Sequence, residues 1–380
     1  MKVASLLFKN DSFVEEKNEE NLDFAHAKLV LGFGSSALIS KQQSFDSIKS
    51  KFPDAQIVLS SSAGEIFGLD VLDNTISLVA LDFSSSKVET KKVNIADFDN
   101  SFNAGKSLIK DLCHDQIKFI MVLSDGGKVN GSELVKGMNS SNESGVLITG
   151  GLAGDGTKFE QTFVGLNALP ETGNVVAIAF YGEKLMVSHG SLGGWDSFGL
   201  ERTVTKSQDN ILFEIDHKSA LDLYKTYLGK YAEELPGSAL LFPLSINLSD
   251  NQQPIVRTIL SVDESNHSMT FAGDLPVGSK VRFMKANFDR LIDAASDAAS
   301  NCFEMNQSNP KLALLISCVG RKIILGNRID EEVAAVSEIF GNQTTLSGFY
   351  SYGEISPLRP FENCELLNQT MTITGINEMD

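Results

Sequence analysis

The sequence predicts an α/β protein, with a mixed α+β arrangement as the variant, built from two domains that each hold a β-sheet flanked by helices. Apolar runs of strand length alternate along the chain with segments of helical periodicity, which is typical of sheets covered by helices. The chain has 380 residues, more than a single hydrophobic core usually organises. Hydrophobic residues make up 42% of it and charged residues 21%, so apolar side chains suffice for two cores.

The first part of the chain predicts a strand followed by two strand–helix–strand units. Residues 1–8 predict the first strand, and the acidic segment 11–23 predicts a solvated connection. The apolar spacing then predicts strands at 28–33, 55–60, 117–123 and 145–149, and helices at 45–52, 102–114 and 132–138. Two further pairs of runs, 74–83 with 87–95 and 174–182 with 184–188, flank short polar turns and predict β-hairpins.

A domain boundary is expected near residue 230. A helical pattern over 220–228 ends at Gly229, and a Pro-Gly pair follows at Pro236. We therefore predict domains at 1–230 and 231–380. In the second domain the spacing predicts strands at 255–262, 268–271, 280–284, 311–317 and 344–349, with helices at 286–305 and 331–340.

The net charge and the cysteines indicate which partners and which cell compartment to expect for the protein. The formal net charge is −17, and no cluster of Lys and Arg is dense enough to neutralise a run of phosphates, so nucleic acid is not an expected partner. No apolar run approaches the roughly 20 residues that span a bilayer, so no membrane partner is expected. The four cysteines contain no C-x-x-C pair, and the first residues lack a secretory signal. A cytoplasmic protein is expected.

Three turns of similar form recur at predicted strand ends: Ser62–Ile66, Leu152–Gly156 and Ser351–Ile355. In each, a glycine is followed at once by a carboxylate. A glycine there permits φ > 0 or a close backbone approach, and the carboxyl ends of strands are where open α/β sheets usually bind ligands. A single turn of this kind is more often a plain turn or cap. Three with the same spacing indicate a ligand site to which both domains contribute.

Catalytic motifs are absent from the sequence. There is no G-x-S-x-G elbow and no H-E-x-x-H, and the five histidines lack metal-ligand spacing. Cys318 ends a predicted strand and is either a buried structural cysteine or a nucleophile. Arg321 is the expected ligand anchor, because a guanidinium can clamp a carboxylate with two hydrogen bonds; the alternative is a salt bridge to Glu354 or Asp330. Trp195, the only tryptophan, either lines a pocket or fills a core.

With these residues in view, the chain resembles the FIST family of bacterial sensory proteins, which carry a FIST N and a FIST C domain. The resemblance covers nearly the whole chain. In the first domain it rests on Ser62–Ile66, Leu123–Gly126, Gly150–Gly156 and Ile215–Asp216 with Ala220–Tyr224. In the second it rests on Phe271–Gly278, Cys318–Arg321 with Leu325–Gly326, and Gly348–Ile355. It implies a module of signal transduction that binds small molecules such as amino acids.

The resemblance also implies a sharper hypothesis. With no output domain fused, the chain is expected to be a stand-alone sensor that acts on a separate histidine kinase or cyclic-di-GMP protein, and some stand-alone members resemble haem-containing nitric-oxide sensors. Haem needs an axial ligand such as His, and His189 and His217 are the candidates. His217 stands where the family motif has Gly, and Leu367 stands where family members have His.

We therefore predict a sensor and not an enzyme, with haem as its candidate cofactor. The alternatives are an amino-acid or other metabolite sensor without haem, an enzyme that uses Cys318 or the carboxylates Glu65 and Glu354, and a scaffold without a ligand. The predicted ligand-binding residues are Gly64, Glu65, Gly151, Gly154, Asp155, Cys318, Arg321, Tyr350, Tyr352 and Glu354.

Overall fold

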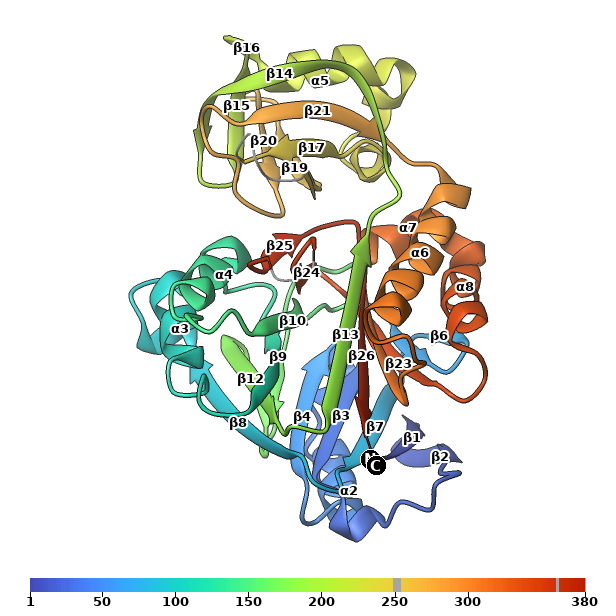
Figure 1. The fold of residues 1–380 in the computed structure, drawn as a ribbon. Helices are drawn as coiled ribbons and strands as arrows, with labels where there is room; N and C mark the ends of the chain where they lie inside the picture. The colour runs from blue at the N-terminus through green and yellow to red at the C-terminus, as the bar shows by residue number, and fades with distance from the viewer. Residues whose placement is uncertain (249–253, 360–361, 380) are drawn as a thin grey trace.

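The computed structural model describes residues 1–248, 254–359 and 362–379. Within these residues the strands form four sheets, three of six strands and one of eight. The eight-stranded sheet makes an upper lobe, residues 196–285, and the other described residues make the body below it (Figure 1). The predicted α/β class is confirmed, because helices flank several of these sheets.

The first body sheet runs β11-β4-β3-β7-β1-β2, and two helices cover its outer face. Its strands are β1 (Lys2–Lys9), β2 (Ser12–Lys17), β3 (Leu29–Gly34), β4 (Gln56–Ser61), β7 (Ile76–Asp82) and β11 (Val164–Leu166), and its helices are α1 (Ser36–Ile39) and α2 (Gln42–Lys51). The pair β3 and β4 is parallel, which confirms the predicted strand–helix–strand unit. Both strands are buried on both faces, as their continuous apolar runs indicate.

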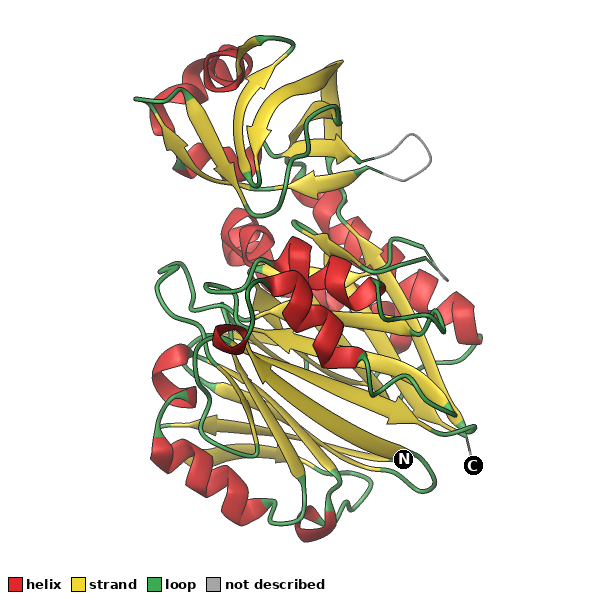
Figure 2. Cartoon of the chain, turned by 90° about the vertical axis from the view of Figure 1, so that its left-hand side faces the viewer, coloured by secondary structure: helices red, strands yellow, loops and turns green. Residues whose placement is uncertain are grey.

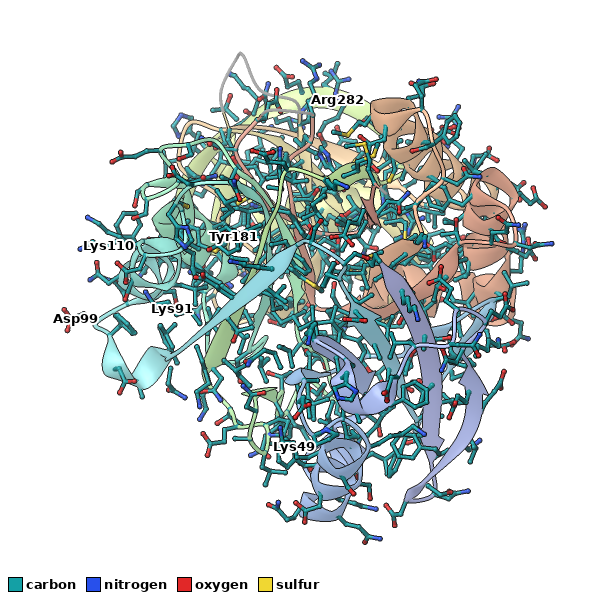
Figure 3. The ribbon with its side chains drawn as sticks, turned by 60° about the horizontal axis from the view of Figure 1, so that its bottom comes forward. Lys49, Lys91, Asp99, Lys110, Tyr181 and Arg282 are labelled. Carbon is teal, nitrogen blue, oxygen red and sulfur yellow. The ribbon has the colours of Figure 1, made fainter. Side chains whose placement is uncertain are left out.

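The second body sheet runs β25-β24-β10-β9-β12-β8. It contains β8 (Lys87–Asn94), β9 (Ile117–Ser124), β10 (Leu147–Leu152), β12 (Asn174–Tyr181), β24 (Gly353–Ser356) and β25 (Glu365–Leu367), with α3 (Ser101–Ile109) and α4 (Gly131–Asn139) outside it. Tyr181 and Lys91, labelled in Figure 3, fasten the end of α3 to this sheet: Tyr181 Oη donates to the Leu112 carbonyl and Lys91 Nζ to the Ser107 carbonyl, each at 2.7 Å.

The third body sheet runs β13-β26-β22-β23-β5-β6. It contains β5 (Glu65–Phe67), β6 (Asp70–Leu72), β13 (Leu185–Leu192), β22 (Leu312–Cys318), β23 (Thr345–Ser351) and β26 (Met371–Glu378), under α6 (Phe288–Asn306), α7 (Val319–Leu325) and α8 (Ile329–Phe340). Helix α6 begins at its cap Asn287, whose side chain accepts the Arg290 N–H, and ends where Gln307 turns left-handed.

The upper lobe holds β14 (Asp196–Gln208), β15 (Ile211–Ile215), β16 (Lys218–Ser219), β17 (Leu244–Asn247), β18 (Ile255–Arg257), β19 (Ile259–Asp263), β20 (Ser268–Phe271), β21 (Lys280–Lys285) and α5 (Ala220–Leu228). The predicted boundary at residue 230 lies inside this lobe, directly after α5. The chain after residue 287 returns to the body and completes its sheets (Figure 1). None of the helices described in either part is long and apolar enough to cross a membrane.

The inner faces of the three body sheets enclose one apolar interior. Leu31 on β3, Met121 on β9 and Leu314 on β22 belong to the same buried cluster. At its centre the rings of Phe33 and Phe349 stack with centroids 4.8 Å apart. The helices lie on the outside of the body, where each group covers its own sheet (Figure 2).

The three sheets exchange strands in a cycle, and the exchange occurs at the three glycine–carboxylate turns. After β4 in the first sheet, the chain crosses to the third sheet, where β5 pairs with β23. After β23, it crosses to the second sheet, where β24 pairs with β10. After β10, it crosses to the first sheet, where β11 pairs with β4. At each of the three turns the chain leaves one sheet and enters the next, and we call these turns junctions.

Both predicted hairpins are wrong. Strand β7 pairs with β1 and β3 while β8 pairs with β12, and β12 pairs with β8 and β9 while β13 pairs with β26. Each short turn carries the chain into another sheet instead of back along the same one.

The acidic segment is also more ordered than predicted. Asn10 and Asp11, both with positive φ, form a tight turn, and β2 pairs with β1 as an exposed edge strand.

Candidate functional site

A cleft of about 400 Å³ lies between the upper lobe and the body. The body contributes the segment 126–131 together with Leu152, Phe159 and Tyr352. The lobe contributes Asn210, Leu260 and the segment 271–274. We call this cavity the interlobe cleft. Its volume is in the range of small-molecule sites, and its walls come from both of the parts into which the structure divides.

The floor of the cleft is the loop between β9 and α4. The Asp125 carboxylate accepts the N–H groups of Gly127 at 2.8 Å and Lys128 at 2.6 Å, and it also accepts the Gly173 N–H at 2.8 Å. Gly126 lies so close to β10 that a Cβ on it would come within 2.1 Å of the Ala153 carbonyl oxygen. The loop is therefore held in one conformation by a buried carboxylate and by a glycine that no other residue can replace without a shift.

The second glycine–carboxylate turn shapes the wall beside this floor. Asp155 accepts the backbone N–H groups of Phe159, Glu160 and Gln161, each at 2.8 Å, and it also accepts the Tyr352 hydroxyl. Burial alone would raise the pKa of Asp155, but these hydrogen bonds lower it below its usual value. The carboxylate is thus ionised at neutral pH. It fixes the Phe159 ring against that of Tyr352, with centroids 4.5 Å apart and planes 17° apart.

The lobe meets the body along one edge of the cleft. Asp274 of the lobe pairs with Lys136 of α4 at 3.1 Å, and its backbone N–H donates to the Ser132 hydroxyl at 3.3 Å. Arg257 is buried between the two parts and donates to the carbonyl of Leu366 at 2.8 Å. These contacts set the width of the cleft.

The carboxylates of the first and third glycine–carboxylate turns do not line the cleft, although Tyr352 of the third turn does. Glu65 accepts hydrogen bonds from Ser62 and Thr75, while Glu354 accepts the equivalent set from Ser351 and Thr370. Both carboxyl groups are buried, and burial raises the pKa of each to about 7. Both carboxylates are engaged within the body, and the second and third turns reach the interlobe cleft through Leu152 and Tyr352.

Arg321 is not placed as a ligand anchor. Its side chain is fully buried, and Nε donates to Glu332 at 2.7 Å while the two terminal nitrogens donate to the carbonyls of Gly193 at 2.7 Å and Leu291 at 2.6 Å. A salt bridge is observed, but its partner is Glu332 and not the expected Glu354 or Asp330. Tyr350 is buried beside this pair and donates to Glu332 at 3.3 Å. The guanidinium joins Gly193, just after β13, to α6 and α8, and because the side chain is fully buried it presents no donor to a ligand.

The other predicted residues away from the cleft also have structural surroundings. Cys318 is 3% exposed and burial raises the pKa of its thiol well above the usual value, which disfavours the nucleophilic thiolate. Three of the predicted glycines are closely packed, so that an added Cβ would clash. It would lie 2.4 Å from Lys322 Nζ at Gly64, 2.8 Å from Ile316 at Gly151 and 2.9 Å from the Ala63 nitrogen at Gly154. Tyr352 alone among the predicted residues lines the cleft directly, with Asp155 behind it.

The two candidate haem ligands lie in different parts of the structure and do not fit the cofactor. His189 lies on β13, is 3% exposed, and its burial lowers the pKa to about 4. His217 lies at an exposed turn between β15 and β16. Neither lines the interlobe cleft. Across the described residues, no group of three or more His, Cys, Asp or Glu is arranged to hold a metal ion.

Sequence reasoning missed the side chains that shape the cleft most. Phe159, Leu260 and Lys128 line it and carried no prediction. The signal was present in part, because Leu123–Gly126 and Phe271–Gly278 were among the stretches that supported the family resemblance, and both reach the cleft through their glycines. Trp195 lies outside the cleft and packs with the helices of the third sheet, where Nε1 donates to the Gln369 carbonyl at 3.0 Å.

Comparisons with known proteins support the sequence resemblance. The FIST N domain model matches residues 28–218 and the FIST C domain model matches 220–357. A search of curated proteins finds no match. Among solved structures, a chorismatase is similar at 9% identity and a TM-score of 0.35, covering 98% of each chain. A cyanuric acid hydrolase from A. caulinodans is similar at 6% identity and a TM-score of 0.40, covering 100% of this chain and 99% of that one. Similarity this low carries no argument about activity.

Proposed function

The chain belongs to the FIST family, a family of signalling sensors, and from that premise we propose that it senses a small molecule bound in the interlobe cleft. The observation that carries the proposal is the cleft itself. Its lining comes from both parts of the chain, so a ligand that touches both walls stabilises one position of the lobe relative to the other. That change in lobe position would be the signal.

The connections between lobe and body suit this role. The chain enters the lobe after β13 and leaves it before α6, through residues 193–195 and 286–287. Both connections lie on the side of α6 in Figure 1, while the Asp274–Lys136 pair lies on the side of α4. Because that ion pair is partly exposed, it contributes little to stability. This ion pair therefore holds the edge of the cleft weakly, and the stronger contact between lobe and body is the hydrogen bond from buried Arg257 to the Leu366 carbonyl.

A thermal-shift screen tests the proposal. The protein is mixed with pools of amino acids and other metabolites, and a ligand at 100 times its Kd should add about 2.7 kcal/mol of stability. Gly127→Leu serves as the blocked variant, since a Cβ there has no atom nearer than 3.7 Å and the side chain enters the cleft. Gly237→Leu, at an open position elsewhere in the lobe, is the matched control. A ligand that stabilises the wild type and the blocked variant equally would exclude the cleft.

The finer versions of the sensor proposal rest on the family resemblance. One is that the protein controls a separate histidine kinase or a cyclic-di-GMP protein in the cytoplasm; the four free cysteines suit a reducing compartment. A change in kinase autophosphorylation on adding the protein would test it. The other is haem binding, which the surroundings of His189 and His217 do not favour. Purification with haem supplied and an absorption spectrum test it, and a Soret band that His189→Ala abolishes would reverse our assessment.

We propose binding rather than catalysis for this chain. The groups that an enzyme would use, Cys318 and the carboxyl groups of Glu65 and Glu354, are buried in the body and engaged by neighbouring residues. The carboxylate that reaches the cleft wall, Asp155, is occupied by four hydrogen bonds.

A further inference from the structure

We propose that the molecule bound in the interlobe cleft is a planar aromatic anion, which stacks on Phe159 and places its charge near Lys128. The inference rests on the proposed function and deepens it by naming the ligand class. Three features of the cleft support it: an exposed aromatic ring held in place, an exposed apolar side chain on the facing lobe, and a lysine without a carboxylate partner.

Phe159 is exposed in a way that packing does not explain. It remains 53% exposed although it lies beside a cavity wall. Its backbone has φ of +56°, a conformation that a bulky residue rarely adopts, and such residues gather at ligand-binding sites. Asp155 holds it there through three consecutive N–H groups. The fold thus maintains an unfavourable backbone conformation to present a half-exposed ring.

The ring offers a flat surface backed by a second ring. Tyr352 stacks on Phe159 from the body side, and its hydroxyl is fixed by Asp155. The two rings are therefore rigid, and a third planar ring can stack on Phe159 without reordering either of them. Leu260 of the lobe lines the same cleft and is 45% exposed, so the lobe contributes an apolar side chain to the same cavity. A ligand ring that contacts both side chains would couple binding to lobe position.

A lysine without an ionic partner favours an anionic ligand. The charged side chains that line it are Lys128 and Asp274. Asp274 pairs with Lys136 at 3.1 Å, and Lys136 also pairs with Glu133 at 2.7 Å. Lys128 Nζ donates to the Thr172 hydroxyl at 2.7 Å and, in the described part of the chain, forms no ion pair. Lys128 is therefore the charged lining residue without an ionic partner, and a carboxylate on the ligand would supply one.

Three probe molecules test the ring and the charge separately. Indole-3-carboxylate has both, cyclohexanecarboxylate keeps the charge on a non-aromatic ring, and indole keeps the ring without the charge. Binding is measured by isothermal titration calorimetry with the full chain. We expect indole-3-carboxylate to bind at least tenfold more tightly than either of the others. Equal binding of cyclohexanecarboxylate would overturn the aromatic assignment, and equal binding of indole would overturn the anionic one.

Variants separate a binding role of Phe159 from a structural one. Phe159→Gly removes the ring but suits the positive φ, so affinity for indole-3-carboxylate should fall at least tenfold while the unfolding midpoint stays unchanged or rises. Phe159→Trp should retain binding. Phe288→Ala, at a ring that is 44% exposed on α6 outside the cleft, should change neither quantity. Unchanged affinity in Phe159→Gly, or a loss that follows a large drop in the midpoint, would overturn the role.

The outcome also distinguishes this inference from the proposed function. If a non-aromatic or cationic metabolite binds the wild type and not Gly127→Leu, the cleft is a sensor site and the aromatic anion is refuted. If neither the probes nor the metabolite pools bind, both proposals fail. Lys128→Met provides the last check, because it should reduce the affinity for indole-3-carboxylate to that for indole.

Discussion

Replacing Glu354 by Gln should change how the stability of the protein depends on pH. Burial raises the pKa of Glu354 from 4.5 to about 7 in the folded chain. Between those pH values the unfolded carboxyl is ionised while the folded one still holds its proton, so the unfolded state binds fewer protons and stability falls as the pH rises. At about 1.4 kcal/mol per pH unit, this single group makes the free energy of unfolding fall by about 3 kcal/mol from pH 4.5 to pH 7.

The amide introduced by Glu354→Gln would mimic the protonated carboxyl. Its nitrogen can donate to the Ser351 hydroxyl, and its oxygen can still accept from Thr370, the two partners that Glu354 has. The measured quantity is the difference in unfolding free energy between Glu354→Gln and the wild type, from urea titrations at several pH values. Taking the difference removes the contributions of Glu65, which shares the raised pKa, and of His189, whose lowered pKa acts in the opposite direction.

We expect this difference to move in favour of the variant by about 3 kcal/mol between pH 4.5 and pH 7. A difference that stays constant within about 0.5 kcal/mol over that range would refute the assignment of a protonated, buried carboxyl at the third junction. Glu378→Gln is the control of opposite sign. Backbone N–H groups of Ser84 and Ser85 and the terminal amine lower the pKa of Glu378 below its usual range despite burial. Its stabilisation is present at neutral pH and is lost as the pH falls below 4.5.

Three further predictions concern residues of the body. Arg321→Met should destabilise the protein by about 3–5 kcal/mol in urea titrations, because it leaves Glu332 buried without its cation; a loss below about 1 kcal/mol would contradict the buried pair. Cys318 should react with a thiol reagent more slowly than a model thiol does, since burial raises its pKa, and faster labelling would restore the nucleophile hypothesis. Gly126→Ala should weaken ligand binding and lower the unfolding midpoint, because its Cβ would lie 2.1 Å from a carbonyl oxygen. Gly127→Ala should do neither, because its Cβ would have no atom nearer than 3.7 Å.

Local sequence patterns predicted most helices and strands correctly, but they did not predict which strands pair with each other. Strands such as β9 and β22 are continuous apolar runs because both faces are buried, and α6 shows its apolar stripe because one face packs on the third sheet. The turn between β7 and β8 looks like that of a hairpin, since the polar residues of a turn are the same whether the chain folds back or crosses to another sheet. The Ser84 and Ser85 N–H groups of that turn bind Glu378, which lies 294 residues after Ser84 in the chain.

The sequence motifs near the site could be recognised, but the position of the cleft could not be predicted. The three glycine–carboxylate turns were recognisable because each is a local sequence pattern, and a site with contributions from both ends of the chain follows from their repetition. Which residues of these turns reach the cleft depends on what packs beside each turn. Glu65 finds Thr75, and Glu354 finds Thr370, while Asp155 turns back onto its own loop and onto Tyr352. None of these pairings can be read from spacing alone.

The sequence by itself determined the α/β class, the positions of most strands and helices, the FIST family and the three junction turns, because each depends on neighbouring residues or on motifs short enough to recognise. The tertiary structure alone decided that the sheets exchange strands in a cycle and that Arg321 is paired with Glu332 inside the body. It also decided that the exposed ring of Phe159 lines the same cleft as Leu260. These depend on which distant segments meet. Burial and pairing arise from contacts between residues far apart in the chain. A local sequence pattern can therefore indicate that a residue makes a tertiary contact, but it does not identify the partner.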